Sequence, residues 1–178
     1  PTSHHLSIAK LCLEQKCHFA TSSYISPDMK SLDKDVKKSD LVFVNEVGLD
    51  PGIDHFFSHL LVDQLKNQDF KDLSVSYDSY CGGIPALPNN FKYKFSWSPI
   101  GVIKALNNKA KFIKDFKEIS ITPYKHIKNY SINNEKFEGY PNRNSIPYIK
   151  EYNFPEMWKI ENFVRGTLKI KISQIIFP

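Results

Sequence analysis

The chain has 178 residues, of which 41% are hydrophobic and 13% aromatic, enough for the core of one domain or slightly more. No apolar run approaches the ~20 residues of a membrane span, and the first residues lack the charged-then-apolar order of a signal peptide. The formal net charge is +5, but lysine is scattered rather than clustered on one segment. We therefore expect neither a membrane nor a nucleic-acid partner.

Cysteine and histidine are sparse. The chain has three cysteines, Cys12, Cys17 and Cys81. Because they are few and odd in number, a disulfide framework is not expected, and a reducing compartment is favoured. We expect a cytoplasmic location, with the mitochondrial matrix as the alternative. No C-x-x-C or similar ligand pair is present, so no metal site is predicted. His55 and His59 lack the glutamate of H-E-x-x-H and are interpreted as ordinary helix residues.

The first part of the chain alternates helices and strands. Apolar residues at helical spacing predict a helix over residues 5–16, and a short apolar strand follows over residues 18–21. Ser26 and Pro27 predict the start of a second helix. Residues 41–44 are continuously apolar, which is typical of a strand buried on both faces. This order indicates a parallel sheet with crossover helices.

Ligands of such sheets bind outside the carboxyl ends of the strands. The loops at those ends are residues 21–26 and 45–52, and they face one crevice if the two strands are neighbours. The second loop runs into a third predicted helix, which begins at Asp50-Pro51-Gly52 and extends to about residue 67. Asp50 is expected to be its N-cap, with Pro51 at the first helical position.

The pattern changes near residue 70. Leu73, Val75 and Tyr77 alternate with polar residues, which predicts a half-exposed strand of an antiparallel sheet over residues 71–79. Ser98 and Pro99 predict a helix to residue 106. Further strands are expected over 111–122 and 164–172, and residues 124–161 are interpreted as irregular. We therefore place a domain boundary near residue 70.

Six separated strings carry a family resemblance. They are TSSYISP from Thr21, NEVGLDPGIDH from Asn45, YCGGIPA from Tyr80, YKFSWSPIGV from Tyr93, YPNRNS from Tyr140 and VRGTLK from Val164. In this order they resemble the saccharopine dehydrogenases that form L-glutamate, including the form fused to lysine–ketoglutarate reductase. Because the six strings span nearly the whole chain, the resemblance is more specific than any one of them.

The resemblance implies an α/β fold in two parts. Residues 1–68 would be the C-terminal part of a Rossmann-type parallel sheet, and residues 69–178 a mixed α+β substrate domain. The glycine-rich turn that binds the pyrophosphate would lie outside this chain. This piece alone is therefore expected to bind dinucleotide poorly and to be inactive. The implied cofactor is NADP or NAD, and a homo-oligomer is possible.

The resemblance also implies a reaction. The secondary amine of saccharopine is oxidised by hydride transfer to the nicotinamide, and the imine is hydrolysed to aminoadipate semialdehyde and glutamate. The implied cofactor contacts are Ser22, Ser23, Leu49, Asp50, Pro51, Trp97 and Ser98. The implied substrate contacts are Ser23, Tyr24, Arg143, Thr167, Leu168 and Lys169, with Arg165 adjacent.

Proton transfer needs a titratable group near the amine. The candidates are Asp50, Tyr24 and Cys81, which the sequence does not rank, and Cys81 could instead be a packing residue. Of the 24 basic residues only Arg143 and Arg165 are arginine, the side chain that binds a carboxylate through two hydrogen bonds. Lys169 stands where the family commonly has arginine. Lysine keeps the positive charge, but it cannot form the two parallel hydrogen bonds that arginine makes to a carboxylate.

Two alternatives remain open. One is a dehydrogenase of another amine-linked amino acid, against which the strings around Arg143 and Thr167 argue. The other is a noncatalytic remnant, which the missing glycine-rich turn would favour.

Overall fold

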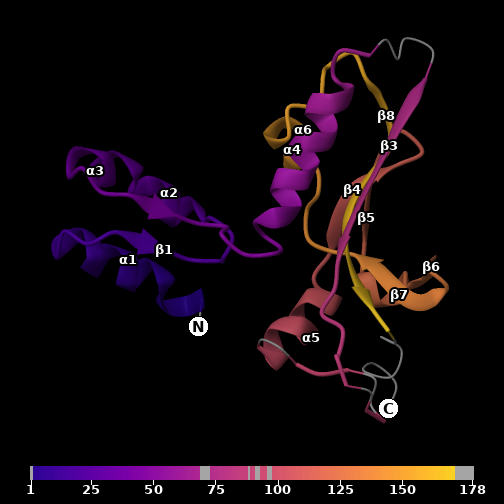
Figure 1. Ribbon diagram of the computed structural model, residues 1–178, viewed down its shortest axis with the longest axis horizontal. Helices are drawn as coiled ribbons and strands as arrows, with labels where there is room; N and C mark the ends of the chain where they lie inside the picture. Colours follow the sequence, from indigo (N-terminus) through magenta and orange to yellow (C-terminus); the bar gives the residue numbers. More distant parts are fainter. Residues whose placement is uncertain (1, 69–72, 88, 91–92, 96–97, 171–178) are drawn as a thin grey trace. The chain divides into compact units, whose positions relative to one another are not determined.

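The computed structural model describes residues 2–68, 73–87, 89–90, 93–95 and 98–170 (Figure 1). The chain divides into two compact units, Pro1–Ser58 and His59–Pro178, and helix α4 (Ile53–Leu65) is continuous through the boundary. Across the described residues, no helix has both the length and the apolar character needed to cross a membrane.

The first unit alternates helices with two short strands. Its elements before α4 are η1 (Thr2–His4), α1 (His5–Glu14), β1 (Phe19–Ala20), α2 (Pro27–Ser31), α3 (Asp33–Lys38) and β2 (Phe43–Val44). The two strands are parallel neighbours, with Phe19 opposite Phe43 and Ala20 opposite Val44. The alternation and the parallel pairing expected from the sequence are therefore confirmed for this unit.

The helices of this unit share one small core. Ser26 caps α2, because its Oγ accepts a hydrogen bond from the backbone N–H of Met29 at 3.2 Å. The predicted second helix is divided in two at Leu32. Ala9, Met29, Leu32 and Val36 form the buried cluster, against which the phenylalanines of both strands pack.

The prediction that residues 41–44 are buried on both faces is wrong. Successive side chains of a strand point to opposite faces, so Phe43 points to the helical core while its neighbours point away. Val42 is 58% exposed and Val44 is 38% exposed. The described part of this unit has helices against only one face of the two strands.

The second unit is built on a six-stranded sheet in which β8 (Lys159–Lys169) is central. The strand order is β5-β4-β8-β7-β6, and β3 also pairs with β8. The other strands are β3 (Ser74–Cys81), β4 (Ala110–Lys114), β5 (Lys117–Ile121), β6 (Lys128–Ile132) and β7 (Glu135–Pro141). The helices after α4 are α5 (Pro99–Asn107), η2 (Pro123–Lys125) and α6 (Pro147–Glu151).

Three sequence-based expectations fail in this unit. β3 runs parallel to β8, side by side with it in Figure 1, although an antiparallel strand was expected. The predicted strand over 111–122 is a hairpin, β4–β5, which turns at Asp115 and Phe116 with φ of 49° and 62°. The region interpreted as irregular contains η2, the β6–β7 hairpin and α6. That hairpin turns at Asn133-Asn134, where φ is 49° and 65°, values that asparagine tolerates.

The two faces of the sheet are packed differently around β8. On one face Tyr77 stacks on Phe163 with ring centroids 4.6 Å apart, in a cluster with Tyr152, Trp158 and Val62 of α4. On the other face two tyrosine rings cover glycines. A Cβ on Gly166 would lie 2.2 Å from Cε1 of Tyr80, and one on Gly139 would lie 2.6 Å from Cε2 of Tyr130. Side chains alternate along β8, so one face of the sheet carries an aromatic core and the other carries glycines covered by tyrosine rings.

Candidate functional site

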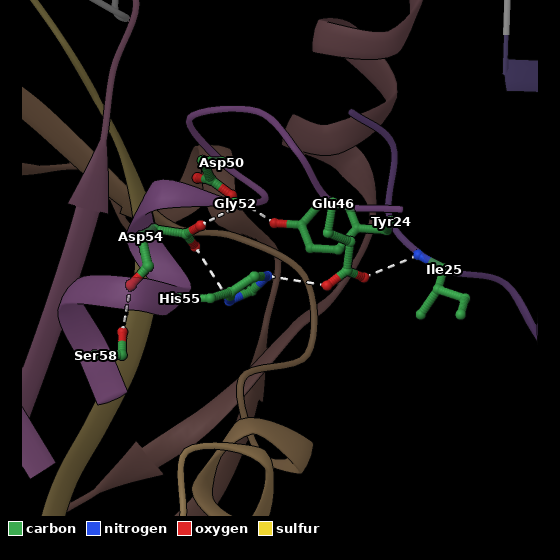
Figure 2. Close-up of polar contacts among 8 residues, drawn as sticks. All are labelled: Tyr24, Ile25, Glu46, Asp50, Gly52, Asp54, His55 and Ser58. Atoms are coloured by element: carbon green, nitrogen blue, oxygen red, sulfur yellow. Dashed lines mark hydrogen bonds and ion pairs between the residues drawn. The ribbon is translucent and has the colours of Figure 1, made fainter. Parts of the chain in front are cut away.

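The loops that follow β1 and β2 run side by side. The N–H of Thr21 donates to the carbonyl of Val44 at 2.9 Å, and the N–H of Glu46 donates to the carbonyl of Ser23 at 3.1 Å. The two candidate proton-transfer residues of these loops are in contact, because the Tyr24 hydroxyl donates to Asp50 Oδ1 at 2.5 Å (Figure 2). The pairing of the strands therefore brings together residues that lie far apart in the sequence.

Asp50 is not the N-cap of the following helix, contrary to the sequence-based expectation. Helix α4 begins at Ile53, and it is Asp54 that accepts a hydrogen bond from the N–H of Gly52, at 2.7 Å. Asp50 lies in the preceding loop, where the Asp50–Pro51 peptide is cis. The loop is tight: Gly52 has φ of 149°, and a Cβ there would lie 2.0 Å from the carbonyl oxygen of Gly48. The Asp50 carboxylate is thus available to Tyr24.

Glu46 and His55 connect the same two loops, and sequence reasoning gave neither a role. Glu46 Oε1 accepts a hydrogen bond from the N–H of Ile25 at 2.9 Å, and Glu46 Oε2 lies 3.1 Å from His55 Nε2. His55 Nδ1 lies 3.7 Å from Asp54 Oδ2 (Figure 2). The string from Asn45 to His55 contains four titratable residues, which is a signal, but their spacing follows no motif. Over the residues with described positions, no group of three or more His, Cys, Asp or Glu could hold a metal ion.

The residues predicted to contact the cofactor lie mostly at these strand ends. Ser22 is exposed, Ser23 is half-buried and Leu49 is 68% exposed. Pro51 is buried, and its carbonyl accepts a hydrogen bond from the N–H of Gly48 at 2.9 Å. Ser98 belongs to the second unit, where its hydroxyl caps α5 by accepting from the N–H of Gly101 at 3.2 Å. Trp97 lies outside the described residues.

In the second unit, three polar residues form a row across neighbouring strands. Cys81 of β3 and Tyr140 of β7 are both register partners of Thr167 on β8. A side-chain hydrogen bond joins Tyr140 to Thr167, and burial raises the pKa of Tyr140 to about 12. Tyr140 and Thr167 of this row therefore offer neutral hydroxyl groups at ordinary pH.

Lys169 lies two residues further along the same face of β8. It is only 6% exposed, its Nζ lies 4.7 Å from the centre of the Tyr93 ring, and Nζ is 3.4 Å from the carbonyl oxygen of Gly83. Burial lowers the pKa of Lys169, and the nearby Cys81 opposes that shift. The amine is thus a buried, desolvated group held against a ring and a carbonyl.

The two arginines of the chain differ in exposure. Arg165 is 6% exposed, and its guanidinium carbon lies 4.0 Å from the centre of the Tyr148 ring. Its backbone N–H donates to the Ser145 hydroxyl at 2.9 Å. Arg143 is exposed and has φ of 59°, and its carbonyl accepts from the N–H of Lys111 at 2.9 Å. Both backbones are therefore fixed by hydrogen bonds.

Leu168 is separated from the other predicted substrate residues of β8. Its side chain lies near Gly139, on the face opposite to Thr167 and Lys169. Only the backbone of Leu168 is shared with the polar row. The structure thus brings together Tyr24 with Asp50 in one unit, and Cys81, Thr167 and Lys169 in the other.

Comparison with known proteins gives the family. Residues 48–175 match the model of the saccharopine dehydrogenase C-terminal domain. This chain belongs to the saccharopine dehydrogenase family. The saccharopine dehydrogenase [NADP(+), L-glutamate-forming] of Pyricularia oryzae is 38% identical over 95% of this chain and 38% of its own length. The mitochondrial alpha-aminoadipic semialdehyde synthase of Rattus norvegicus is 37% identical over 94% of this chain and 18% of its own length.

A solved structure of a family member has the same fold. The apo histidine-tagged saccharopine dehydrogenase (L-Glu forming) from Saccharomyces cerevisiae superposes with a TM-score of 0.79 at 37% sequence identity. The match covers 95% of this chain and 38% of that chain. This member of the saccharopine dehydrogenase family thus has a mixed α/β fold. The chain spans less than half the length of that relative.

Proposed function

We propose that the complete protein containing this chain is an oxidoreductase that converts saccharopine to aminoadipate semialdehyde and L-glutamate. The proposed cofactor is NADP, which is part of the names of the fungal relatives, and NAD is the alternative. The observation that carries the proposal is the 2.5 Å hydrogen bond from Tyr24 to Asp50 at the carboxyl ends of two parallel strands. Ligands of parallel α/β sheets bind at such strand ends.

Asp50 is proposed as the base. Its carboxylate can accept a proton from the substrate's protonated secondary amine, while the Tyr24 hydroxyl donates to it and fixes its orientation. Loss of that proton frees the nitrogen lone pair, which forms the C=N bond as the hydride leaves the neighbouring carbon. Addition of water to the imine then releases glutamate and the aldehyde, and Asp50 can return the proton to the leaving amine.

The strand ends of the first unit suit a nicotinamide. Ser22 and Leu49 are both exposed there, which offers a hydroxyl for the amide and an apolar side chain for the ring. When bound, the nicotinamide accepts the hydride. We propose that residues 1–68 form part of a Rossmann-type nucleotide-binding domain and residues 69–178 part of the substrate domain. The rest of the cofactor's contacts would come from the remaining length of the complete protein.

The carboxylates of saccharopine require cations. We propose that Arg143 binds one of them, since an exposed arginine on a fixed backbone can form two parallel hydrogen bonds. Thr167 and Lys169 would contact a second carboxylate, because their side chains share one face of β8 with the hydroxyl of Tyr140. Arg165 would support this row through its stacking on Tyr148.

The test is a spectrophotometric assay of the complete protein with saccharopine and NADP or NAD. Wild type should form reduced cofactor only when saccharopine is present. Asp50→Asn should lower kcat by about 10²-fold or more, since general-base catalysis contributes ~10²–10⁴-fold. Glu14→Gln removes an exposed carboxylate of α1 and serves as the matched control with unchanged activity.

Two results would refute this proposal. Folded wild type that reduces neither cofactor would favour a noncatalytic remnant. Turnover with a different amine-linked amino acid, and none with saccharopine, would assign another dehydrogenase reaction. The compartment, cytosol or mitochondrial matrix, would follow from fractionation of the source cells.

A further inference from the structure

Glu46 and His55 are mostly buried polar residues without a part in the proposed chemistry. The side chains of His55 and Glu46 are 16% and 22% exposed, and that of Asp54 is 9% exposed. Burial of ionisable groups is costly unless they are paired. We propose that Glu46 and His55 are positioning residues that hold Tyr24 against Asp50, a proposal that rests on the catalytic function proposed for that pair.

The contacts form a path between the two catalytic candidates. At one end, Glu46 Oε1 accepts from the N–H of Ile25, the residue directly after Tyr24, at 2.9 Å. At the other end, Glu46 Oε2 lies 3.1 Å from Nε2 of His55. His55 is attached to the loop of Asp50, because its backbone N–H donates to the carbonyl of Gly52 at 3.0 Å. Figure 2 shows Glu46 lying between the Tyr24–Ile25 segment and His55.

The backbones of the two loops are already joined by the hydrogen bond from Glu46 to Ser23. That bond sets the spacing of the strand ends, but the direction of the Tyr24 side chain also depends on how the chain leaves at Ile25. Glu46 fixes the position of the backbone at Ile25 relative to the start of α4. A displacement of about 1 Å between reacting groups can lower a rate by ~10²-fold, so this fixation is expected to affect catalysis.

Helix stability alone does not account for His55. The residue lies in the first turn of α4, which begins at Ile53. The positive end of the helix dipole favours an acidic residue in this turn, such as Asp54, and it gives no reason for a histidine there. The imidazole of His55 instead lies 3.1 Å from Glu46 Oε2, which belongs to the loop after β2. Contact with the first loop therefore explains the position of His55 better than capping does.

Two substitutions of His55 distinguish the roles of its two ring nitrogens. The amide nitrogen of His55→Gln can occupy the position of Nε2 and keep the contact with Glu46, whereas that of His55→Asn reaches only the position of Nδ1. In the complete protein, we expect His55→Asn and Glu46→Ala to lower kcat by about 10- to 100-fold, with KM for saccharopine changed less than about threefold. His55→Gln should restore kcat to within about threefold of wild type. Glu14→Gln is the control for loss of an acidic residue.

Crystal structures of the variants supply a readout that does not depend on turnover. The hydrogen bond between Tyr24 and Asp50 should be lost in His55→Asn and retained in His55→Gln. The positioning role is refuted if that hydrogen bond survives in folded His55→Asn, or if kcat of His55→Asn and Glu46→Ala stays within about twofold of an active wild type. A wild type without saccharopine turnover would refute the proposed function instead, and the crystal structures would still decide the positioning role.

Discussion

Substitution of Gly166 by alanine is predicted to destabilise the second unit strongly. Gly166 lies on the central strand β8, opposite Tyr80 of β3. A Cβ at this position would lie 2.2 Å from Cε1 of Tyr80 and 2.7 Å from the carbonyl oxygen of Tyr140. Neither neighbour can move cheaply, because the first belongs to a packed ring and the second to the backbone of β7.

The magnitude follows from these contacts. Overpacking of a close-packed site costs about 1 to 3 kcal/mol. Displacing the Tyr80 ring also breaks its 2.7 Å hydrogen bond with the Tyr130 hydroxyl, worth about 1 kcal/mol. Gly166→Ala should therefore lower the free energy of unfolding by roughly 2 to 4 kcal/mol. It should also raise KM for saccharopine, since Thr167 is the next residue on β8.

Chemical denaturation of the complete protein measures this effect, and a double substitution tests its cause. Removing the ring with Tyr80→Ala should reduce the cost of Gly166→Ala by about 1 kcal/mol or more, because only the clash with Tyr140 remains. Ser120→Ala, at an exposed position of β5, serves as the control. The steric reasoning fails if Gly166→Ala costs less than about 0.5 kcal/mol, or costs the same with and without the Tyr80 ring.

Three further predictions concern Arg143, Tyr140 and Tyr148 of the second unit. Arg143→Lys should raise KM for saccharopine about tenfold with kcat nearly unchanged, because lysine cannot form the bidentate contact; steady-state kinetics with an unaltered KM would contradict this. Because the folded-state pKa of Tyr140 is raised to about 12, its contribution to stability is complete below pH ~10 and is lost as pH rises to about 12. Between pH ~10 and about 12, the free energy of unfolding of Tyr140→Phe should therefore fall by roughly 2 to 3 kcal/mol less than that of wild type. The same pH dependence in both proteins would disprove this prediction. Tyr148→Leu should cost about 1 to 2 kcal/mol more than Tyr148→Phe, since only phenylalanine keeps a ring under Arg165; equal unfolding free energies of the two variants would exclude this.

Local signals in the sequence predicted the first unit well. The Ser26-Pro27 pair marked the start of α2, because a serine hydroxyl and a proline suit the first helical turn for reasons independent of tertiary structure. The parallel pairing of β1 and β2 followed from short crossover connections. Asp50 was misassigned as an N-cap, because sequence alone does not show that the chain makes a tight loop between Gly48 and Gly52 before the helix begins.

Long-range pairing was not predictable in the same way. The direction of β3 depends on β8, which lies more than 70 residues away, and alternation of side chains is the same in parallel and antiparallel strands. The turn at Asn133-Asn134 does carry a recognisable signal, because asparagine is favoured where φ is positive. The pairing of Glu46 with His55 had no periodic signal, because it depends on two loops that meet only when their strands pair.

Saccharopine carrying two deuterium atoms on the carbon that becomes the aldehyde gives the most direct test of the proposed reaction. The complete protein would be given this substrate with NADP or NAD, and the products would be identified by mass spectrometry. The account predicts L-glutamate, aminoadipate semialdehyde that keeps one deuterium, and reduced cofactor that carries the other. Formation of lysine with deuterium retained in it, or the absence of labelled cofactor from a folded and cofactor-bound protein, would contradict the account.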